Sequence, residues 1–249
     1  MKAIIIGAGR GLRLMPSTKD IPKCFAQIGD KRILDWTLEA FRYNGITDIV
    51  FIGGYQIDKV REEYPELRFY HNDDWANNNI LASLMYAEAE MNDEFICCYS
   101  DILFTQKVIS DLLKVDGDIT VVCDTDWLKR YENRTEHPSS DGETMTVENG
   151  LAKEIHRDIP DSEAHGEFIG VTKFSKVGAE QFCRAYHYAN DVFSGKPFRE
   201  AKIFEKAYLI HLYQEMIENG ITFNHSDTVG DYIEIDTQQD FSYARENWR

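Results

Sequence analysis

Short apolar runs and stretches of helical periodicity follow one another along this chain. Apolar runs with the length of buried strands lie at 3–6, 48–53, 67–70, 94–99, 119–123, 152–155 and 168–174. Apolar residues at helical spacing fall at 33–43, 58–63, 81–91, 106–114, 179–188 and 204–219, and again after 236. This alternation is typical of a mostly parallel sheet with helices on both faces, so we expect an α/β fold with a Rossmann-like sheet.

The pattern contains no internal repeat, linker or low-complexity tract, and its length of 249 residues suits one α/β domain. We therefore expect a single domain over 1–249. A polar, charged stretch at 124–149 interrupts the alternation. The strands and helices that follow this stretch predict an added part of the domain that binds a second substrate.

Three glycines within five residues follow the first predicted strand. Gly7, Gly9 and Gly11 let the backbone approach a ligand closely and point several N–H groups into one space. Positive charge beside them comes from Arg10, Arg13 and Lys23. The loop therefore predicts an anionic ligand.

Other readings of this loop fit less well. A dinucleotide-binding Gly-x-Gly-x-x-Gly loop needs its third glycine at position 12, which is Leu12, and no acid closes the second strand, which ends at Gly53. A Gly-x-x-x-x-Gly-Lys-Ser/Thr loop is excluded because no lysine follows the glycines directly. A purely structural turn would leave the two arginines and Lys23 repelling one another.

Composition limits the partners and the compartment. A formal net charge of −16 disfavours binding to nucleic acid. No apolar run reaches the roughly eighteen residues of a membrane span, and the N-terminus has no secretory leader. The odd number of cysteines and the lack of a Cys-x-x-Cys pair predict buried thiols in a reducing compartment, hence a cytoplasmic protein.

The loop as a whole reads Gly7-Ala8-Gly9-Arg10-Gly11-Leu12-Arg13-Leu14, followed by Pro16, Thr18 and the pair Pro22-Lys23. This string resembles the signature of the nucleoside-triphosphate transferases that activate sugar phosphates and phospho-alcohols. The resemblance implies a nucleotide-diphospho-sugar transferase fold, in which 1–123 mainly binds the nucleotide, 124–230 mainly binds the acceptor, and 231–249 forms a metal-binding strand and the final helix. It also implies that the loop wraps the triphosphate, with Arg13 and Lys23 as catalytic residues that counter the charge on the phosphates.

Carboxylates at two distant places suit a metal ion. Asp101 follows an apolar strand, and open α/β sheets bind ligands at the carboxyl ends of their strands. Glu234 and Asp236 alternate on one face of a second strand. The resemblance implies that Asp101 and Asp236 hold Mg²⁺, while a part for Glu234 stays open. For Asp101, a helix N-cap or turn role is the alternative.

The expected nucleotide-binding residues come from the glycine loop, the turn after the second strand and an asparagine run before an apolar helix. They are Gly7, Ala8, Gly9, Arg10, Gly11, Gly54, Tyr55, Asn78, Asn79 and Ser83. The Asn-Asn-x-x-x-Ser element resembles that of cytidylyltransferases acting on phosphocholine or on phosphonates, which implies CTP as the donor. A capped turn is the alternative for the asparagines.

The acceptor side carries weaker signals. Lys129, Arg130 and Arg134 predict a second anion site, with a solvated charged loop as the alternative. Arg157 and Glu167 resemble acceptor-binding positions of the family, although His156-Arg157-Asp158 replaces the expected Glu-Lys-Pro string. A choline head group would instead favour an aromatic cage. Rings for such a cage would come from Trp127, Tyr131, Tyr186, Tyr188 and Tyr213.

We expect a Mg²⁺-dependent cytidylyltransferase that transfers a nucleoside monophosphate from CTP to a small phosphonate or phospho-alcohol, such as 2-aminoethylphosphonate or phosphocholine, and releases pyrophosphate. The alternatives are a sugar-1-phosphate uridylyl- or thymidylyltransferase and, from another class, a regulatory nucleotide-binding module without catalysis. A zinc hydrolase is disfavoured because His71, His137 and His165 have no metal-ligand spacing. Whether the chain forms a homodimer stays open.

Overall fold

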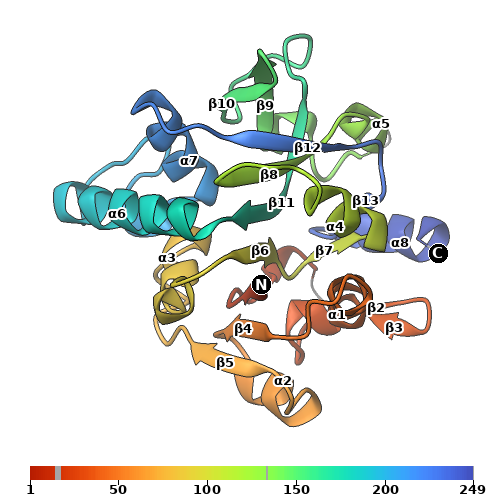
Figure 1. Cartoon of the computed structure of the whole chain (residues 1–249). Helices are drawn as coiled ribbons and strands as arrows, with labels where there is room; N and C mark the ends of the chain where they lie inside the picture. Colours follow the sequence, from red (N-terminus) through yellow and green to blue (C-terminus); the bar gives the residue numbers. More distant parts are fainter. Residues whose placement is uncertain (15–17, 133, 249) are drawn as a thin grey trace.

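The computed structural model describes residues 1–14, 18–132 and 134–248, so Pro16 of the loop signature lies outside the described residues. At its centre lies a nine-stranded sheet with the strand order β10-β9-β11-β6-β1-β4-β5, while β8 pairs with β11 and with β12 (Figure 1). The strands of this sheet are β1 (Lys2–Gly7), β4 (Ile49–Gly53), β5 (Arg68–His71), β6 (Phe95–Tyr99), β8 (Ile119–Asp124), β9 (Thr144–Glu148), β10 (Leu151–Ile155), β11 (Gly166–Phe174) and β12 (Asn224–Thr228).

The part of the sheet built by the N-terminal half is parallel. β1 lies between β4 and β6 and pairs with both in parallel, and β5 continues the parallel order beyond β4. β12 and β8 also run parallel, whereas β11 runs antiparallel to β6, β8 and β9. The expected α/β fold with a mostly parallel central sheet is confirmed, and β11 is the strand that joins the second half of the chain to it.

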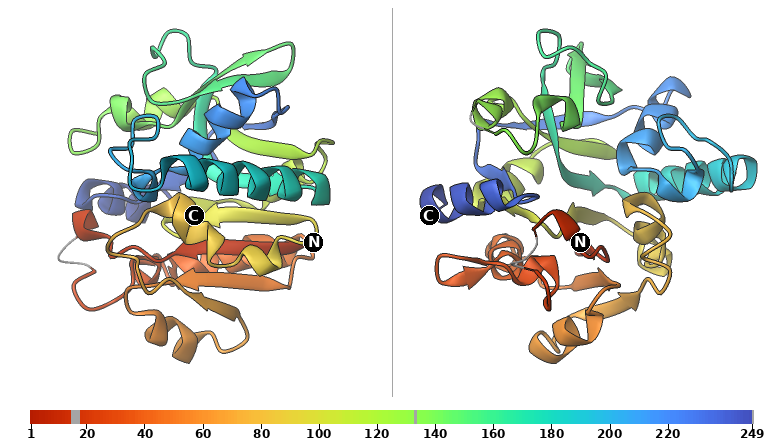
Figure 2. Two further views of the ribbon diagram at one scale, coloured as in Figure 1. Left: turned by 90° about the vertical axis from the view of Figure 1, so that its left-hand side faces the viewer. Right: turned by 180° about the vertical axis from the view of Figure 1, so that it is seen from behind.

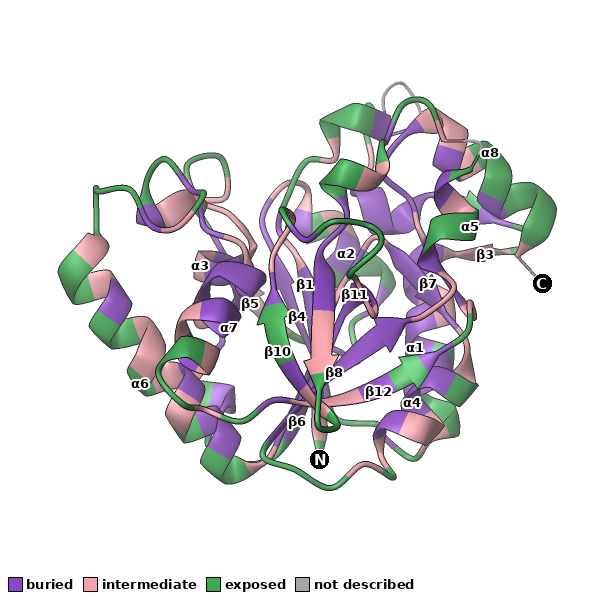
Figure 3. Ribbon diagram, turned by 90° about the horizontal axis from the view of Figure 1, so that it is seen from above, coloured by how far each residue is buried: buried purple, intermediate pink, exposed green. Residues whose placement is uncertain are grey.

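Helices cover both faces of the sheet (Figure 2). Ile4 and Ile6 of β1 pack in one core with Phe182 and Tyr213, whereas Ile5 packs in a second core with α1 and α4. Successive strand side chains point to opposite faces, so β1 contributes to both cores, and the central strands are buried (Figure 3). The helices are α1 (Ile33–Tyr43), α2 (Ile57–Glu63), α3 (Ile80–Met85), α4 (Gln106–Leu112), α5 (Trp127–Tyr131), α6 (Lys176–Phe193), α7 (Leu209–Glu218) and α8 (Gln238–Asn247). Within the described part of the chain, no helix combines the length and apolar character needed to cross a membrane.

The second half holds more regular structure than the sequence indicated. α5 and β9 lie inside the polar stretch at 124–149, and β12 was not expected. The helices expected at 81–91 and 204–219 are shorter, because 3₁₀ turns replace part of each. The 3₁₀ turns of the described residues are Leu12–Leu14, Lys23–Phe25, Glu88–Glu90, Ser139–Asp141 and Phe204–Lys206.

Two small pairings fix segments outside the main sheet. β2 (Gln27–Ile28) and β3 (Lys31–Arg32) form a hairpin that leads into α1. β7 (Ile102–Phe104) pairs antiparallel with β13 (Tyr232–Glu234). Just beyond this pairing the Ile235 N–H donates to the Asp101 carbonyl at 3.0 Å, which brings the late carboxylate segment beside Asp101.

Candidate active site

A cleft of about 720 Å³ opens where β1 and β6 end. Parallel strands present their carboxyl ends at the same edge of a sheet, which is where open α/β folds bind ligands. The walls come from the glycine loop, the start of α3, β11 and the segment around β13. The site residues predicted from the sequence that line it are Gly7, Ala8, Gly9, Arg10, Gly11, Arg13, Lys23, Asn78, Asn79, Ser83, Asp101, Arg157, Glu167 and Asp236.

The three glycines of the loop serve different purposes. A Cβ on Gly7 would lie 2.5 Å from the ring of Phe51, so this position needs glycine for packing against the sheet. Gly11 has φ +66°, and a Cβ there would lie 2.9 Å from the Lys23 side chain. Around Gly9 no described atom lies within 4 Å of such a Cβ, so the loop faces open space at its middle. The Thr18 hydroxyl donates to the Gly11 carbonyl at 3.1 Å and holds the end of the loop.

Four charged side chains form a cluster beside this loop. Lys23 Nζ donates to Asp101 Oδ2 at 2.7 Å and also to Asp236 Oδ1. Arg13 Nη2 donates to Asp236 Oδ2 at 2.6 Å. Burial alone would lower the pKa of Lys23, but the facing carboxylates raise it above its ordinary value. Burial alone would raise the pKa of Asp236, but Lys23 and Arg13 lower it, so both groups are charged at neutral pH.

The cluster has the donor set that Mg²⁺ requires. Asp101 and Asp236 already converge on one cationic atom, Lys23 Nζ, and both present hard carboxylate oxygens. Glu234 lines the same part of the cleft, and burial followed by the charge of Asp236 raises its pKa well above its ordinary value. His137 Nδ1 lies 3.6 Å from Glu234 Oε2. The residues present therefore fit a divalent cation held by carboxylates.

Asn78 and Ser83 also line the cleft, and a network of amide hydrogen bonds holds them in place. Fully buried Asn72 donates through Nδ2 to Asn78 Oδ1 and to Ser83 Oγ, both at 2.8 Å. Asn78 donates back to Asn72 Oδ1 at 3.0 Å. Asn79 caps α3 by accepting from the Ile80 N–H at 2.8 Å, as the capped-turn alternative predicted, and it also lines the cleft. The network fixes which way the Asn78 amide faces.

Gly54 and Tyr55 lie behind the glycine loop and do not line the cleft. A Cβ on Gly54 would lie 2.7 Å from the Ala8 carbonyl oxygen. The Tyr55 N–H donates to that same carbonyl at 3.0 Å, and its hydroxyl donates to the Lys19 carbonyl at 3.0 Å. The Arg10 guanidinium lies 5.2 Å from the centre of the Tyr55 ring. The structure thus gives these two residues contacts that support the loop from outside.

Arg157 and Glu167, which the resemblance places at the acceptor, both line the cleft. Arg157 Nη2 donates to Glu143 Oε1 at 3.1 Å, and its guanidinium lies 4.2 Å from the centre of the Tyr208 ring. Burial raises the pKa of Glu143, although Arg157 and the Tyr99 hydroxyl act against this rise. The Glu167 carboxylate accepts from the Tyr131 hydroxyl at 2.5 Å. This part of the cleft therefore presents one cation and two carboxylates among aromatic rings.

The three basic residues predicted as a second anion site lie outside this cleft, around a separate hollow of about 100 Å³. Lys129 is exposed and pairs with Asp126 at 2.7 Å. Arg130 forms ion pairs with Asp124 and Glu167. Arg134 Nε donates to Asp240 Oδ1 at 2.7 Å. Their charges are thus largely neutralised within the protein.

Residues 3–164 match the family of MobA-like NTP transferase domains, as the loop predicted. The chain belongs to this family. It is a nucleotidyltransferase, and the resemblance noted in the sequence is confirmed.

Two curated relatives are cytidylyltransferases. The CTP:phosphoglutamine cytidylyltransferase of Campylobacter jejuni is 29% identical in an alignment that covers 96% of this chain and 97% of that protein. The choline-phosphate cytidylyltransferase of Streptococcus pneumoniae is 34% identical over 117 residues, which cover 46% of this chain and 51% of that protein.

Two solved structures have the same fold. The CTP:phosphocholine cytidylyltransferase from Streptococcus pneumoniae superposes with a TM-score of 0.72 at 23% identity and covers 100% of this chain and 99% of that one. The inositol-1-phosphate CTP transferase from T. maritima superposes with a TM-score of 0.74 at 18% identity and covers 99% of this chain and 96% of that one.

Several residues that line this nucleotidyltransferase cleft were not predicted as site residues from the sequence. Among them are Trp75, Tyr99, Glu143, Lys206 and Tyr208. Lys206 reaches the asparagine run from a distant segment, since its Nζ donates to the Ala76 carbonyl at 3.0 Å. Asn72 is a polar residue directly after a strand and close to the asparagine run, which is a sequence signal for a site residue. Its hydrogen-bond partners, however, are evident only in the folded structure.

Proposed function

We propose that this nucleotidyltransferase is a Mg²⁺-dependent cytidylyltransferase, which transfers CMP from CTP to a small acceptor that carries a phosphoryl group and releases pyrophosphate. The observation that carries the proposal is the cluster of Lys23, Asp101, Asp236 and Arg13 beside the glycine loop. CTP as the donor is supported by the relative that matches along nearly the whole chain and is named as a cytidylyltransferase. We assign the whole chain to one catalytic domain, because a single sheet runs through both halves.

The chemistry needs charge stabilisation and positioning more than a protein base. An ionised oxygen of the acceptor's phosphoryl group attacks the α-phosphorus of CTP, and pyrophosphate leaves with the electron pair of the broken P–O bond. The second ionisation of a phosphate monoester has a pKa of about 6, so this oxygen carries charge at neutral pH. Arg13 and Lys23 face the negative charge that builds on the phosphates. When bound to Asp101 and Asp236, Mg²⁺ supplies further positive charge there.

The nucleotide end of the cleft supports recognition of a polar base. Ala8 and Gly9 line the cleft and the space beside Gly9 is open, so a triphosphate can approach the backbone of the loop closely there. Asn78 and Ser83 offer an amide and a hydroxyl whose orientation Asn72 fixes. We infer that these groups contact the base or the ribose, whereas Gly54 and Tyr55 support the loop that binds the triphosphate.

The acceptor end favours a polar acceptor over a quaternary ammonium. The rings considered for a choline cage, from Trp127 to Tyr213, lie outside the lining of the cleft, and Arg157 already covers the face of Tyr208. Arg157 can pair with a phosphonate, phosphate or carboxylate, and Glu143 can accept from an amino or amide group. Acceptors of this chemistry include 2-aminoethylphosphonate and the phosphoglutamine in the name of the Campylobacter jejuni relative. We therefore rank them above phosphocholine.

The test is pyrophosphate release with Mg²⁺ and with CTP, UTP or dTTP in turn, across phosphoglutamine, 2-aminoethylphosphonate, phosphocholine and hexose 1-phosphates. We expect release with one small polar acceptor and none when Asp101 or Asp236 is replaced by Asn. A matched control is Asp58→Asn, which removes an exposed carboxylate on α2 that does not line the cleft. Release only with a hexose 1-phosphate and UTP or dTTP would contradict the proposal and favour the sugar-activating alternative. Nucleotide binding without release on any acceptor would favour the regulatory alternative.

A further inference from the structure

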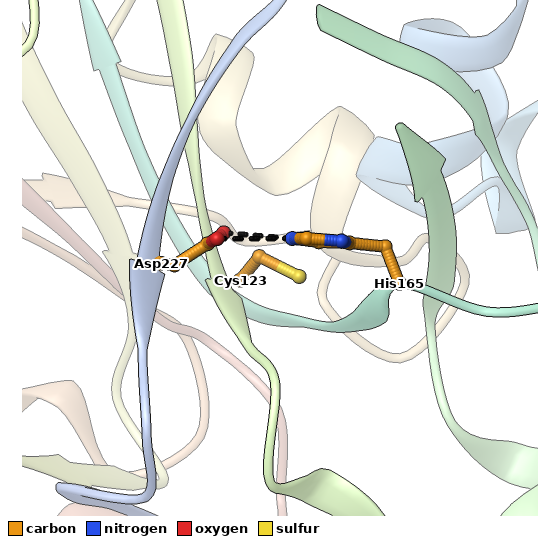
Figure 4. Close-up of side chains that lie close together, drawn as sticks. All are labelled: Cys123, His165 and Asp227. Atoms are coloured by element: carbon orange, nitrogen blue, oxygen red, sulfur yellow. Dashed lines mark hydrogen bonds and ion pairs between the residues drawn. The ribbon is translucent and has the colours of Figure 1, made fainter. Parts of the chain in front are cut away.

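Three side chains with metal-binding chemistry meet outside the cleft lining (Figure 4). They are Cys123 of β8, His165 just before β11, and Asp227 of β12. His165 Nε2 lies 3.0 Å from Asp227 Oδ2, and the ligand atoms of all three residues lie within 4.8 Å of one another. Neither the glycine loop nor the charged cluster of the cleft uses them.

The backbone brings these residues together. Asp227 is registered opposite Cys123 in the parallel pair of β12 and β8, so both side chains start on the same face of the sheet. The start of β11 passes close to the thiol, because a Cβ on Gly166, its first residue, would lie 2.5 Å from Cys123 Sγ. That passage carries His165 to the same place. His225, two residues before Asp227 on β12, lies with Nδ1 2.7 Å from Asp227 Oδ1 and orients the carboxylate.

We propose that Cys123, His165 and Asp227 form a binding site for Zn²⁺, distinct from the magnesium site of the cleft. Thiolate, imidazole and carboxylate are the side-chain ligands that zinc uses, whereas Mg²⁺ prefers oxygen alone. Ligand atoms on a tetrahedral zinc ion lie roughly 3.3–3.6 Å apart, so the cluster reaches this geometry after small side-chain movements. A thiolate and a carboxylate together balance the charge of the ion.

Without a metal the thiol is protonated at neutral pH, since burial, then Asp227 and Glu167, raise the pKa of Cys123 well above its ordinary value. Binding of the cation therefore displaces the thiol proton into solvent. The ion can enter from solvent, because the side chains of His165 and Asp227 are 32% and 38% exposed. Bound there, it would link β8, β12 and the segment that enters β11, two residues before cleft residue Glu167.

The test is a titration of the metal-free full chain with Co²⁺, in the presence of millimolar Mg²⁺. A cobalt–thiolate bond gives a charge-transfer absorption in the near ultraviolet that oxygen and nitrogen ligands do not give. We expect this absorption at one equivalent of Co²⁺, its loss on adding Zn²⁺, and a rise in Tm when Zn²⁺ is bound. Cobalt bound at the carboxylates of the cleft would not produce the band. A folded chain that binds no Co²⁺, or binds it without the band, would overturn the proposal.

Variants distinguish metal binding at this site from binding at other thiols and histidines of the chain. Cys123→Ser should abolish the band, and His165→Ala and Asp227→Asn should each weaken Zn²⁺ binding about tenfold or more. The last two are partly exposed, so they test the site even where Cys123→Ser fails to fold. Cys183→Ser, at a partly buried thiol on α6, and His187→Ala, at a histidine paired with Glu88, should change nothing. A band that survives Cys123→Ser but not Cys183→Ser would contradict the assignment.

Discussion

Replacement of Lys23 by Met tests the charged cluster most severely. One buried ammonium holds two carboxylates, and the Lys23 and Asp236 side chains are only 10% and 6% exposed. Methionine keeps a flexible chain of similar length but removes the charge and the hydrogen bonds. Asp236 then keeps Arg13, while the attraction that holds Asp101 toward Asp236 is lost.

The expected loss of stability follows from this burial. Removing one partner of a buried ion pair costs about 3–5 kcal/mol. We expect the lower end, since Asp101 is 27% exposed and Asp236 keeps a second cation. A loss of about 3 kcal/mol lowers the Tm of a domain of this size by roughly 6–12 °C.

Arg13→Ala provides the contrast, because the Arg13 side chain is 60% exposed. An exposed ion pair contributes about 1 kcal/mol or less, so the Tm should fall by no more than about 4 °C. Both substitutions should lower kcat with CTP by roughly 10²–10³-fold, the usual cost of one donor to a developing anion. Arg61→Ala removes another exposed arginine, which pairs with Asp58 at 2.9 Å, and should change neither quantity.

The assays are thermal unfolding by circular dichroism and pyrophosphate release at saturating CTP with the acceptor that supports turnover. Turnover at the parent rate in Lys23→Met would refute the role of this lysine in charge stabilisation. A Lys23→Met protein with the parent Tm would show that the buried ion pair contributes nothing to stability. Either result would also undermine the inferred positions of the metal ligands.

Further predictions concern the two ends of the cleft and the loss of stability at acid pH. Arg157→Gln should raise the KM for the acceptor about tenfold and leave that for CTP unchanged; an equal rise in both would contradict its place at the acceptor end. Asn72→Ala should lower the free energy of unfolding in urea by about 1–3 kcal/mol, because Asn78 and Ser83 lose a buried partner. It should also raise the KM for CTP. An unchanged KM would argue against recognition of the base or ribose by these two residues. The pKa of Asp236 is lowered from 3.8 to about 2. The ionised Asp236 therefore contributes its full stabilisation at a pH above 3.8, and this stabilisation is lost as the pH falls toward about 2. Asp236→Asn should make the free energy of unfolding depend less on pH in that window. An unchanged dependence on pH would contradict the pairing.

The sequence predicted the parts of the site whose signal is local. The strand, the glycines and Lys23 lie within one short segment, so their spacing alone indicated an anion-binding loop. Asp101 was predicted because it follows an apolar strand, and such strand ends meet at one edge of a parallel sheet. Asp236 and Asp101 lie together as the resemblance implied, through the pairing of β7 with β13.

The rest depended on partners that are distant in sequence. Arg130 and Arg134 were predicted to bind a second anion, yet Arg130 also pairs with Glu167 and Arg134 with Asp240, which lie 37 and 106 positions away. The same limit hid the cluster of Cys123, His165 and Asp227, because His165 and Asp227 are 62 positions apart and show no motif spacing. Side chains that meet only in the folded sheet leave no local pattern.

One competition assay tests the central claim most directly. The protein is incubated with Mg²⁺, the acceptor panel and an equimolar mixture of CTP, UTP, ATP, GTP and dTTP, and the conjugates formed are identified by mass. The account predicts that cytidylyl conjugates of one small polar acceptor predominate, with pyrophosphate in equal amount. Predominance of a uridylyl or thymidylyl sugar, or consumption of nucleotide without any conjugate, would contradict it.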